Sequence, residues 1–213
     1  MSDSKNITAW LLLVLLAVAG GGFAVLGVVQ SHVPLDQAVP NTLAASNYTE
    51  DFSQTTPQGT ETEHVVFQAP DSLGGFEQIG AQRTYVLIQG NRAFAVTTNG
   101  SRASAAHLVF RKANVQPAKL IDPAHRYLPY ANQAQHVVSN GDTHTFTVTQ
   151  MGQVGAFVYV VSGWHVAQMR LAVPAARASV RLNISKVGTS PPVGLPAGAT
   201  IGSGTFGTSS SAG

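Results

Sequence analysis

The chain contains seven histidines and ten acidic residues but no cysteine, which limits its options for metal binding and catalysis. Without cysteine there is no disulfide, no thiol nucleophile and no thiolate metal ligand. The histidines form neither an H-x-x-x-H nor an H-E-x-x-H pair, and there is no G-x-S-x-G motif. No glycine-rich segment follows a predicted strand and opens a helix, as phosphate binding would require. We therefore expect no metal site, no cofactor and no enzymatic activity.

Two arginines on neighbouring predicted strands are candidates for contact with an anion. A four-residue loop at 174–177 would place Leu171 opposite Val180 and Arg170 opposite Arg181, so that the apolar faces of the two strands agree. Like charges directly opposite each other are destabilising. We expect an acidic residue from the 36–77 segment, an anion or an acidic partner beside Arg170 and Arg181. The alternative is that the two side chains extend separately into water.

Charge is distributed unevenly along the chain. Residues 36–77 contain seven acids and no base, whereas residues 83–186 contain eleven bases and two acids. These two segments either pack together and neutralise each other, or present a basic face to anionic headgroups or an acidic partner. The net charge is only +2, so we expect no nucleic-acid binding.

Apolar side chains in or beside the predicted strands are candidates for ligand binding. Such residues usually fill a core, but a curved sheet can leave part of them as a groove for an acyl chain. The predicted groove consists of Phe67, Leu73, Phe76, Tyr85, Leu87, Phe94, Phe146, Met169 and Leu171.

The elements that must position these residues are mostly strands. Alternating patterns predict strands at 48–55, 63–68, 84–89, 93–97, 135–139, 142–150, 154–161, 164–173 and 178–186. Residues 41–46 could open a short helix, and 103–131 is the least strand-like part, with proline breaks that suggest one or two helices. A turn at Asn140-Gly141 would pair Val137 with His144 and leave His136 on the other face.

The N-terminal segment at 7–29 is uncharged and apolar. As a helix it would be about 34 Å long, enough to cross a hydrocarbon core of about 30 Å. Lys5 is the only base near it, which predicts a cytoplasmic N-terminus and an extracytoplasmic domain, hence a single-pass plasma-membrane protein. The alternative is a signal peptide cleaved at Ala17-Val18-Ala19.

The remaining boundaries follow from composition. We expect a cytoplasmic tip at 1–6, a linker at 30–40, one β-rich domain at 41–196, and a disordered tail at 197–213 that is rich in glycine, serine and threonine.

Four short segments resemble the actinobacterial relatives of the LolA/LprG-like exported lipid-binding proteins. They lie at 42–46, 66–73, 85–94 and 187–193. The resemblance implies a mainly β (α+β) fold in which a curved antiparallel half-barrel is closed by one or two short helices. It also implies a groove for lipids or acyl chains. This chain differs from the lipoprotein members because it has no cysteine to acylate and a predicted membrane helix instead.

These observations predict a membrane-anchored, non-catalytic module that binds a lipid-like or other apolar ligand. The alternative is an interaction or sensor domain with a filled core, which binds another envelope protein.

Overall fold

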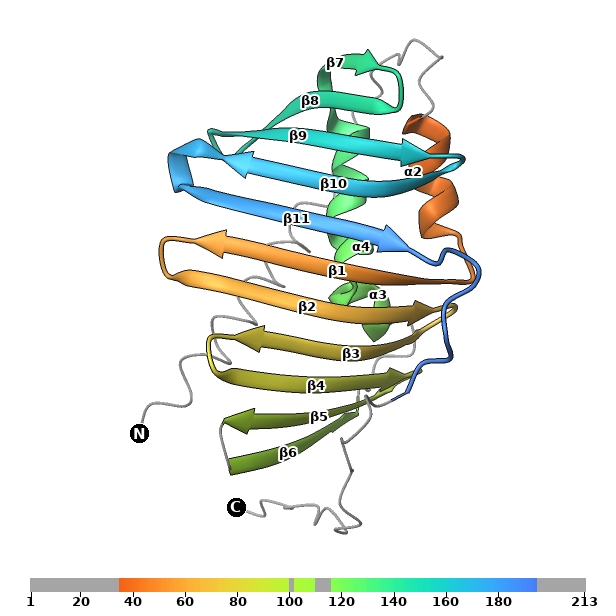
Figure 1. Ribbon diagram of the computed structural model, residues 1–213, viewed down its shortest axis with the longest axis vertical. Helices are drawn as coiled ribbons and strands as arrows, with labels where there is room; N and C mark the ends of the chain where they lie inside the picture. The colour runs from red at the N-terminus through yellow and green to blue at the C-terminus, as the bar shows by residue number, and fades with distance from the viewer. Residues whose placement is uncertain (1–34, 100–101, 110–115, 195–213) are drawn as a thin grey trace, which may run out of the picture.

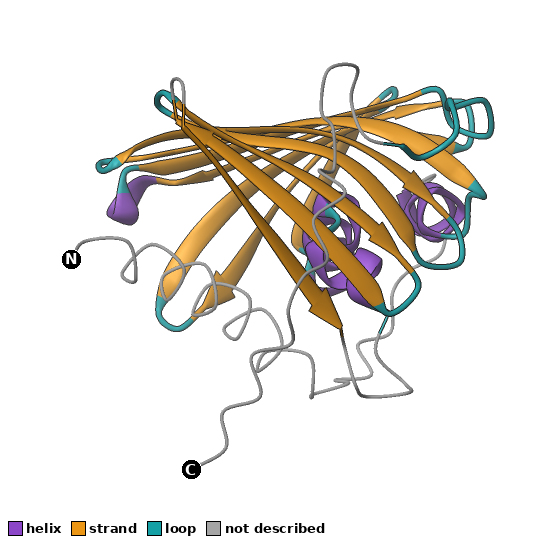
Figure 2. Cartoon of the chain, turned by 90° about the horizontal axis from the view of Figure 1, so that it is seen from below, coloured by secondary structure: helices purple, strands orange, loops and turns teal. Residues whose placement is uncertain are grey.

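One curved antiparallel sheet, with short helices on its concave side, makes up the domain (Figure 1, Figure 2). This computed structural model describes residues 35–99, 102–109 and 116–194. The predicted tip at 1–6, membrane helix at 7–29 and tail at 197–213 lie outside those ranges. Within them, no helix has the length and apolarity needed to cross a membrane.

Eleven strands form the sheet in the order β6-β5-β4-β3-β2-β1-β11-β10-β9-β8-β7, and every neighbouring pair is antiparallel. Two consecutive runs, β1 to β6 and β7 to β11, meet where β1 pairs with β11. The described strands therefore form an open half-barrel with β6 and β7 at its edges. Their bounds are Asn47–Thr56 (β1), Gly59–Gln68 (β2), Ser72–Ile79 (β3), Gln82–Gln89 (β4), Arg92–Asn99 (β5), Arg102–Val109 (β6), Gln135–Asn140 (β7), Thr143–Gln150 (β8), Gln153–Ser162 (β9), His165–Val173 (β10) and Ala178–Ser185 (β11).

The link between β6 and β7 carries three short helical segments across the concave face (Figure 1). These are α3 (Pro117–Ile121), α4 (Pro123–Tyr127) and the 3-10 helix η1 (Leu128–Gln133). Each has proline at its first or second position, where the missing N–H costs nothing. A further 3-10 turn, η2 (Pro174–Ala176), lies between β10 and β11. The predicted helices and proline breaks in 103–131 are thus confirmed from Pro117 onward.

The α2 helix (Leu35–Leu43) corrects the predicted linker at 30–40 and the predicted helix at 41–46. It begins earlier because Leu35, Ala38, Val39 and Thr42 follow a spacing of three and four residues, so that they share one buried face. The Thr42 hydroxyl also accepts the backbone N–H of Val166 on β10. This helix is therefore part of the domain.

The sequence patterns did not predict two of the strands, β3 and β6. In β3, Gly74 and Gly75 interrupt the apolar pattern, but a Cβ on Gly75 would overlap the backbone of His64, and a Cβ on Gly74 would approach Gly194 and Val193. Glycine is required because two backbone segments pass close to this strand. The β6 strand is rich in alanine, which is a poor strand former, and it is formed by pairing with β5.

The register of the β7–β8 hairpin differs by one residue from the prediction. Asn140 pairs with Thr143 and Ser139 with His144, so the turn is Gly141-Asp142, with Gly141 at φ +57°. The Ser139 hydroxyl lies 2.9 Å from Nδ1 of His144, which fixes this pairing. A bulge near His136 disrupts the rest of β7. In contrast, the predicted pairing of Arg170 with Arg181 is confirmed.

Candidate functional site

The predicted groove residues do not form one surface, because they lie on both faces of the sheet. Cross-strand partners point to the same side of a sheet. Phe67 pairs with Tyr48 on one side and with Leu73 on the other. The Tyr48 hydroxyl donates to Asp122 at the start of α4, so Phe67 and Leu73 lie on the helix-covered face. The concave members of the predicted set are Phe67, Leu73, Phe146, Met169 and Leu171. The first four are fully buried in the core.

The other four predicted residues lie on the convex face. Phe76 pairs with Tyr85, and Leu87 pairs with Phe94. Phe76 and Leu73 are three residues apart on one strand, and an odd spacing turns them to opposite faces. The guanidinium carbon of Arg83 lies 4.5 Å from the centre of the Phe76 ring. A single groove containing all nine residues is therefore excluded by the geometry.

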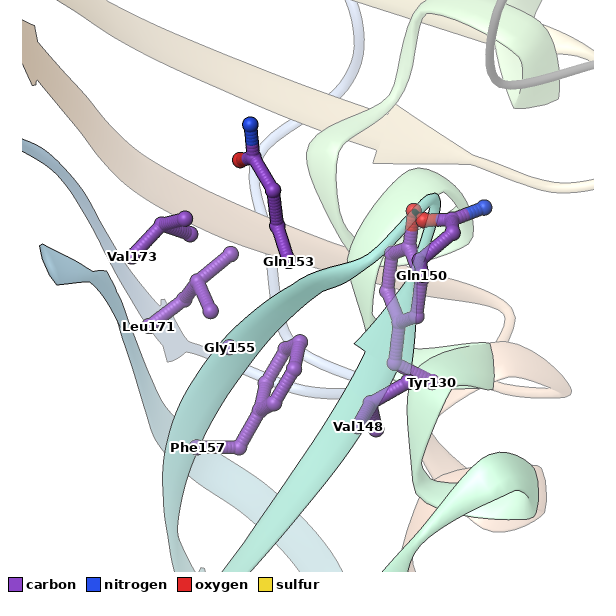
Figure 3. Close-up of a pocket in the computed structure, with 8 residues that line it drawn as sticks. All are labelled: Tyr130, Val148, Gln150, Gln153, Gly155, Phe157, Leu171 and Val173. Carbon is purple, nitrogen blue, oxygen red and sulfur yellow. Dashed lines mark hydrogen bonds between the residues drawn. The ribbon is translucent and has the colours of Figure 1, made fainter. Parts of the chain in front are cut away.

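A small apolar pocket lies on the concave side between η1 and the strands β8, β9 and β10 (Figure 3). Its volume is about 120 Å³. Figure 3 shows Tyr130 and Gln150 on one side of the pocket and Leu171 and Val173 on the other, with Phe157 between them. Of the predicted groove residues, only Leu171 lines this pocket. The remaining lining residues are Val148, Gln153 and Gly155.

Gly155 keeps the floor of this pocket open. A Cβ at this position would lie 2.9 Å from Cδ1 of Leu171 and 3.3 Å from Cε2 of Phe157. Aromatic rings pack together in its walls: the Phe157 ring stacks on Phe146 at 5.2 Å between centroids and lies 5.4 Å from the ring of Tyr130. The Tyr130 hydroxyl donates to Oε1 of Gln150 at the rim, at 3.3 Å. The result is an apolar slot with polar groups at its mouth, an arrangement suited to an apolar chain.

A buried polar cluster attaches α4 to the middle of the sheet. Asp122 is the N-cap of this helix, and its Oδ2 accepts the backbone N–H of His125 at 3.0 Å and the hydroxyl of Tyr48 at 2.7 Å. The same oxygen lies 2.7 Å from Nδ1 of His125. Burial and the adjacent Asp122 charge raise the pKa of Tyr48, so its hydroxyl remains a donor.

Glu50 lies fully buried next to this cluster. Its Oε1 accepts the backbone N–H of Ala124 at 3.0 Å. Burial, followed by the nearby charge of Asp122, raises the pKa of Glu50 well above its usual value. Glu50 Oε2 and Asp122 Oδ1 have no donor if both groups are ionised. A proton retained on Glu50 supplies the donor for a carboxyl–carboxylate hydrogen bond between the two side chains.

Further acids extend along the concave face from Glu50. Glu63 pairs directly with Glu77 across β2 and β3, and Glu61 lies two residues from Glu63 on the same face. The Arg126 guanidinium donates to Oε1 of Glu63 at 2.8 Å. Burial, then the charges of Glu63 and Glu77, raise the pKa of Glu61 to about 7. Four of the seven acids of the 36–77 segment, Glu50, Glu61, Glu63 and Glu77, thus lie on the concave face, and Arg126 pairs with Glu63.

The acid expected beside the arginine pair is not found among the described residues. Arg170 and Arg181 are both exposed on the convex face, and Arg181 also pairs with Ser53. No hydrogen bond or ion pair to either guanidinium occurs within the described ranges. Both side chains extend separately into water, as in the alternative expected from the sequence.

A histidine–aspartate pair lies on the convex face. His64 Nδ1 lies 2.7 Å from Oδ1 of Asp51, on the exposed convex face beside a hollow of about 330 Å³. Ser53 and Phe76 also line that hollow. No buried nucleophile accompanies the pair, and within the described ranges no three His, Cys, Asp or Glu side chains are grouped to hold a metal ion. The expected absence of catalysis and metal remains a prediction.

Sequence reasoning missed the residues that shape the interior, namely Tyr130, Gly155, Glu50 and Asp122. A signal was present for Asp122, because an Asp before a proline and an apolar residue is typical of a helix start. Gly155 sits inside a strongly alternating strand, where a glycine often marks a close approach. Glu50 gave no local signal, because its burial depends on α4, which is distant in sequence.

Comparison with known proteins gives similarity at the level of the fold only. No protein-family model matches the chain, and a search of curated proteins finds no match. The structure is similar to that of LprF from Mycobacterium bovis, with a TM-score of 0.46 and 12% identity, covering 76% of this chain and 94% of that one. It is also similar to a DUF1329 family protein from Desulfovibrio piger, with a TM-score of 0.35 and 10% identity, covering 76% and 93%.

The architecture is established by the strand order and by the position of the helices. An open antiparallel sheet curves around α3, α4 and η1 (Figure 2). The resemblance implies a curved antiparallel half-barrel with short helices, and the strand order confirms that architecture.

Proposed function

We propose that this protein is a membrane-anchored, extracytoplasmic and non-catalytic module that binds a lipid-like or other apolar ligand. The anchor is the apolar segment at 7–29, and the single base Lys5 before it supports the orientation. The binding site is the pocket between η1 and strands β8, β9 and β10.

The observation that carries this proposal is the slot that Gly155 leaves open between Phe157 and Leu171. Pockets for small molecules usually enclose about 300–1,000 Å³. A slot of about 120 Å³ is smaller, so it would take the end of an apolar chain rather than a whole lipid. The polar rim at Gln150 and Gln153 would then face the polar part of the ligand.

Photolabelling of the full chain in vesicles would test this assignment. The probe is a fatty acid with a diazirine near its methyl end, and the crosslinked residues are mapped by mass spectrometry. We expect crosslinks to Tyr130, Leu171 and Val173, because these residues surround the slot. Labelling confined to residues outside the pocket would contradict the proposal, because it would show that the probe reaches the protein only from the bilayer.

A matched pair of variants makes the test specific. Gly155→Ala places a methyl group between Leu171 and Phe157, so crosslinking in the pocket should fall several-fold. Ala156→Val adds two methyl groups to the next residue, which pairs with Ala172 on the opposite face of the sheet. Crosslinking in this control should match the parent chain.

A second candidate function is an interaction or sensor domain with a filled core. It is favoured by the packed concave side and by the half-buried aromatic residues on the convex face, Phe76, Tyr85 and Phe94. The hollow beside His64 lies on the same face. If the pocket remains unlabelled, this candidate becomes the better one.

A further inference from the structure

The turns at one end of the half-barrel form a surface of distinct composition. We call this the hairpin end, and it consists of the turns at 57–58, 80–81, 151–152 and 174–177. All four lie along the left edge of the sheet in Figure 1. Antiparallel pairing brings them together although they are far apart in sequence.

Apolar side chains are exposed at the hairpin end. Met151 is 82% exposed, Ile79 is 50% exposed and Val154 is 49% exposed. Pro57, Ala81 and Ala175 are also exposed in these turns. Large apolar residues that cluster at loop tips commonly mark an interaction surface rather than a core.

The hairpin end has no negative charge in its described turns. Residues 55–60, 79–83, 149–154 and 173–178 contain no Asp or Glu, and the first acid beyond them is Glu61, which pairs with Ile79. Two bases are present: Arg83, which donates to Gln78, and Arg177. Arg177 is exposed at the tip of the β10–β11 loop. Apolar tips with arginine and no acid are complementary to a surface of anionic headgroups over hydrocarbon.

Met151 occupies a turn position that normally suits another residue. Met151 and Gly152 have φ angles of +50° and +75° and form the two-residue turn between β8 and β9. Such turns favour Asn-Gly, because few side chains tolerate a positive φ. A methionine here is unfavourable for the fold and adds apolar surface to the outside, which suggests that its side chain has a role in contact with something else.

The apolar pocket opens toward the same end. Gln150 and Gln153 at its mouth flank the Met151 turn, and Val173 precedes the β10–β11 loop. A chain that left the pocket here would emerge beside the exposed Met151 and Val154.

The opposite end of the sheet differs in charge. Trp164 is 64% exposed there, and the adjacent β7–β8 turn carries Asp142. The same end also carries Asp71 in the more distant β2–β3 turn, together with the exposed bases Arg92 and Lys186. The backbone N–H of Val161 donates to the carbonyl of Asp142, which places that turn close to the β9–β10 turn. This end is therefore not free of acids, and Asp142 close to the tryptophan opposes contact with anionic headgroups.

We propose that the hairpin end docks on the surface of a lipid bilayer that contains anionic headgroups, with Met151 inserted and Arg177 at headgroup level. This extends the proposed function, because docking in this orientation brings the mouth of the pocket to the bilayer from which an acyl chain would come.

The absence of cysteine allows a direct test on the full chain. Met151→Cys and Ser162→Cys each place one label, the first at the hairpin end and the second at the exposed start of the opposite turn. An environment-sensitive fluorophore on each is measured in vesicles of phosphatidylcholine, alone or with an equal part of phosphatidylglycerol, with and without brominated acyl chains. Both proteins share the same proposed anchor, which leads into α2, and Asn41 of α2 donates to the carbonyl of Trp164. Tethering alone would therefore bring the label at 162 to the bilayer rather than the label at 151.

We expect a blue shift and bromine quenching for the label at 151, both stronger with phosphatidylglycerol, and neither for the label at 162. Adding Arg177→Ala should weaken docking about fivefold, the effect of one basic residue at an anionic surface. Equal quenching at both positions, quenching only at 162, or no quenching at either would overturn the proposal.

The docking and binding proposals can fail separately. If the label at 151 stays in water while the diazirine probe still crosslinks to Leu171, docking is refuted and ligand binding stands. If the label inserts but the pocket is not crosslinked, docking stands and the proposed ligand is refuted.

Discussion

Single carboxyl groups in the interior control how the domain responds to pH. Glu50 and Glu61 both hold protons more tightly in the folded chain than in the unfolded chain, chiefly because they are buried. Acids with raised pKa values stabilise the fold most at low pH, below their ordinary pKa of 4.5. That contribution falls as pH rises, because the unfolded chain releases its protons first.

We predict that stability decreases between pH 4.5 and pH 7, the window set by the usual value for Glu61 and its raised pKa of about 7. Thermal midpoints of the full chain measured across this range would show it. Glu61→Gln should flatten the slope, because glutamine does not titrate. Glu50→Gln should add stability at the upper end of the range, since its amide can donate to Asp122 in place of the proton. An unchanged slope in both variants would refute this account.

The α4 element depends on polar contacts that a few side chains make with β1 and β2. Arg126 pairs with Glu63, its guanidinium lies 5.2 Å from the centre of the Phe52 ring, and Ala124 donates to Glu50. Apolar burial by so short a helix is small. The helix is therefore held in place largely by its hydrogen bonds and its ion pair.

We predict that Arg126→Met destabilises the domain by about 3–5 kcal/mol, because it leaves Glu63 buried and unpaired beside other acids. The double variant Arg126→Met with Glu63→Gln should recover most of that loss, since no buried charge then remains unpaired. Chemical denaturation of the two single variants and the double variant completes the cycle. Additive losses in the double variant would show that the pair is not coupled.

At the scale of the whole molecule, the β1–β11 pairing decides whether the half-barrel behaves as one unit. Seven residue pairs run along this seam, from Thr49 with Ser185 to Thr55 with Ser179. The core also crosses it, because Phe52 pairs with Leu182 and Leu182 pairs with Met169. Strands from both ends of the chain thus share one core.

We predict a single cooperative unfolding transition in which the two runs of strands unfold together. Leu182→Ala should cost about 2–5 kcal/mol, the usual loss for a fully buried leucine, and shift the whole transition. Far-ultraviolet circular dichroism and the fluorescence of Trp164 on the β9–β10 turn should give the same midpoint. Separate midpoints would show that the two runs are independent units.

The sequence by itself determined the elements with local causes. Alternation of apolar and polar residues identified most strands, and the loop at 174–177 set the register of β10 with β11. The proline breaks at 123 and 129 marked the helical link. These features depend on neighbours a few residues away, so the pattern of residues is sufficient to predict them.

Tertiary structure alone decided which side of the sheet each residue faces and what covers it. Leu73 and Phe76 lie on opposite faces of β3. That strand was not predicted, because Gly74 and Gly75 interrupt its alternating pattern. The burial of Glu50 required α4, some seventy residues away, to pack on β1. Faces, pockets and hairpin ends arise from pairing between distant strands, and no local pattern of residues encodes that pairing.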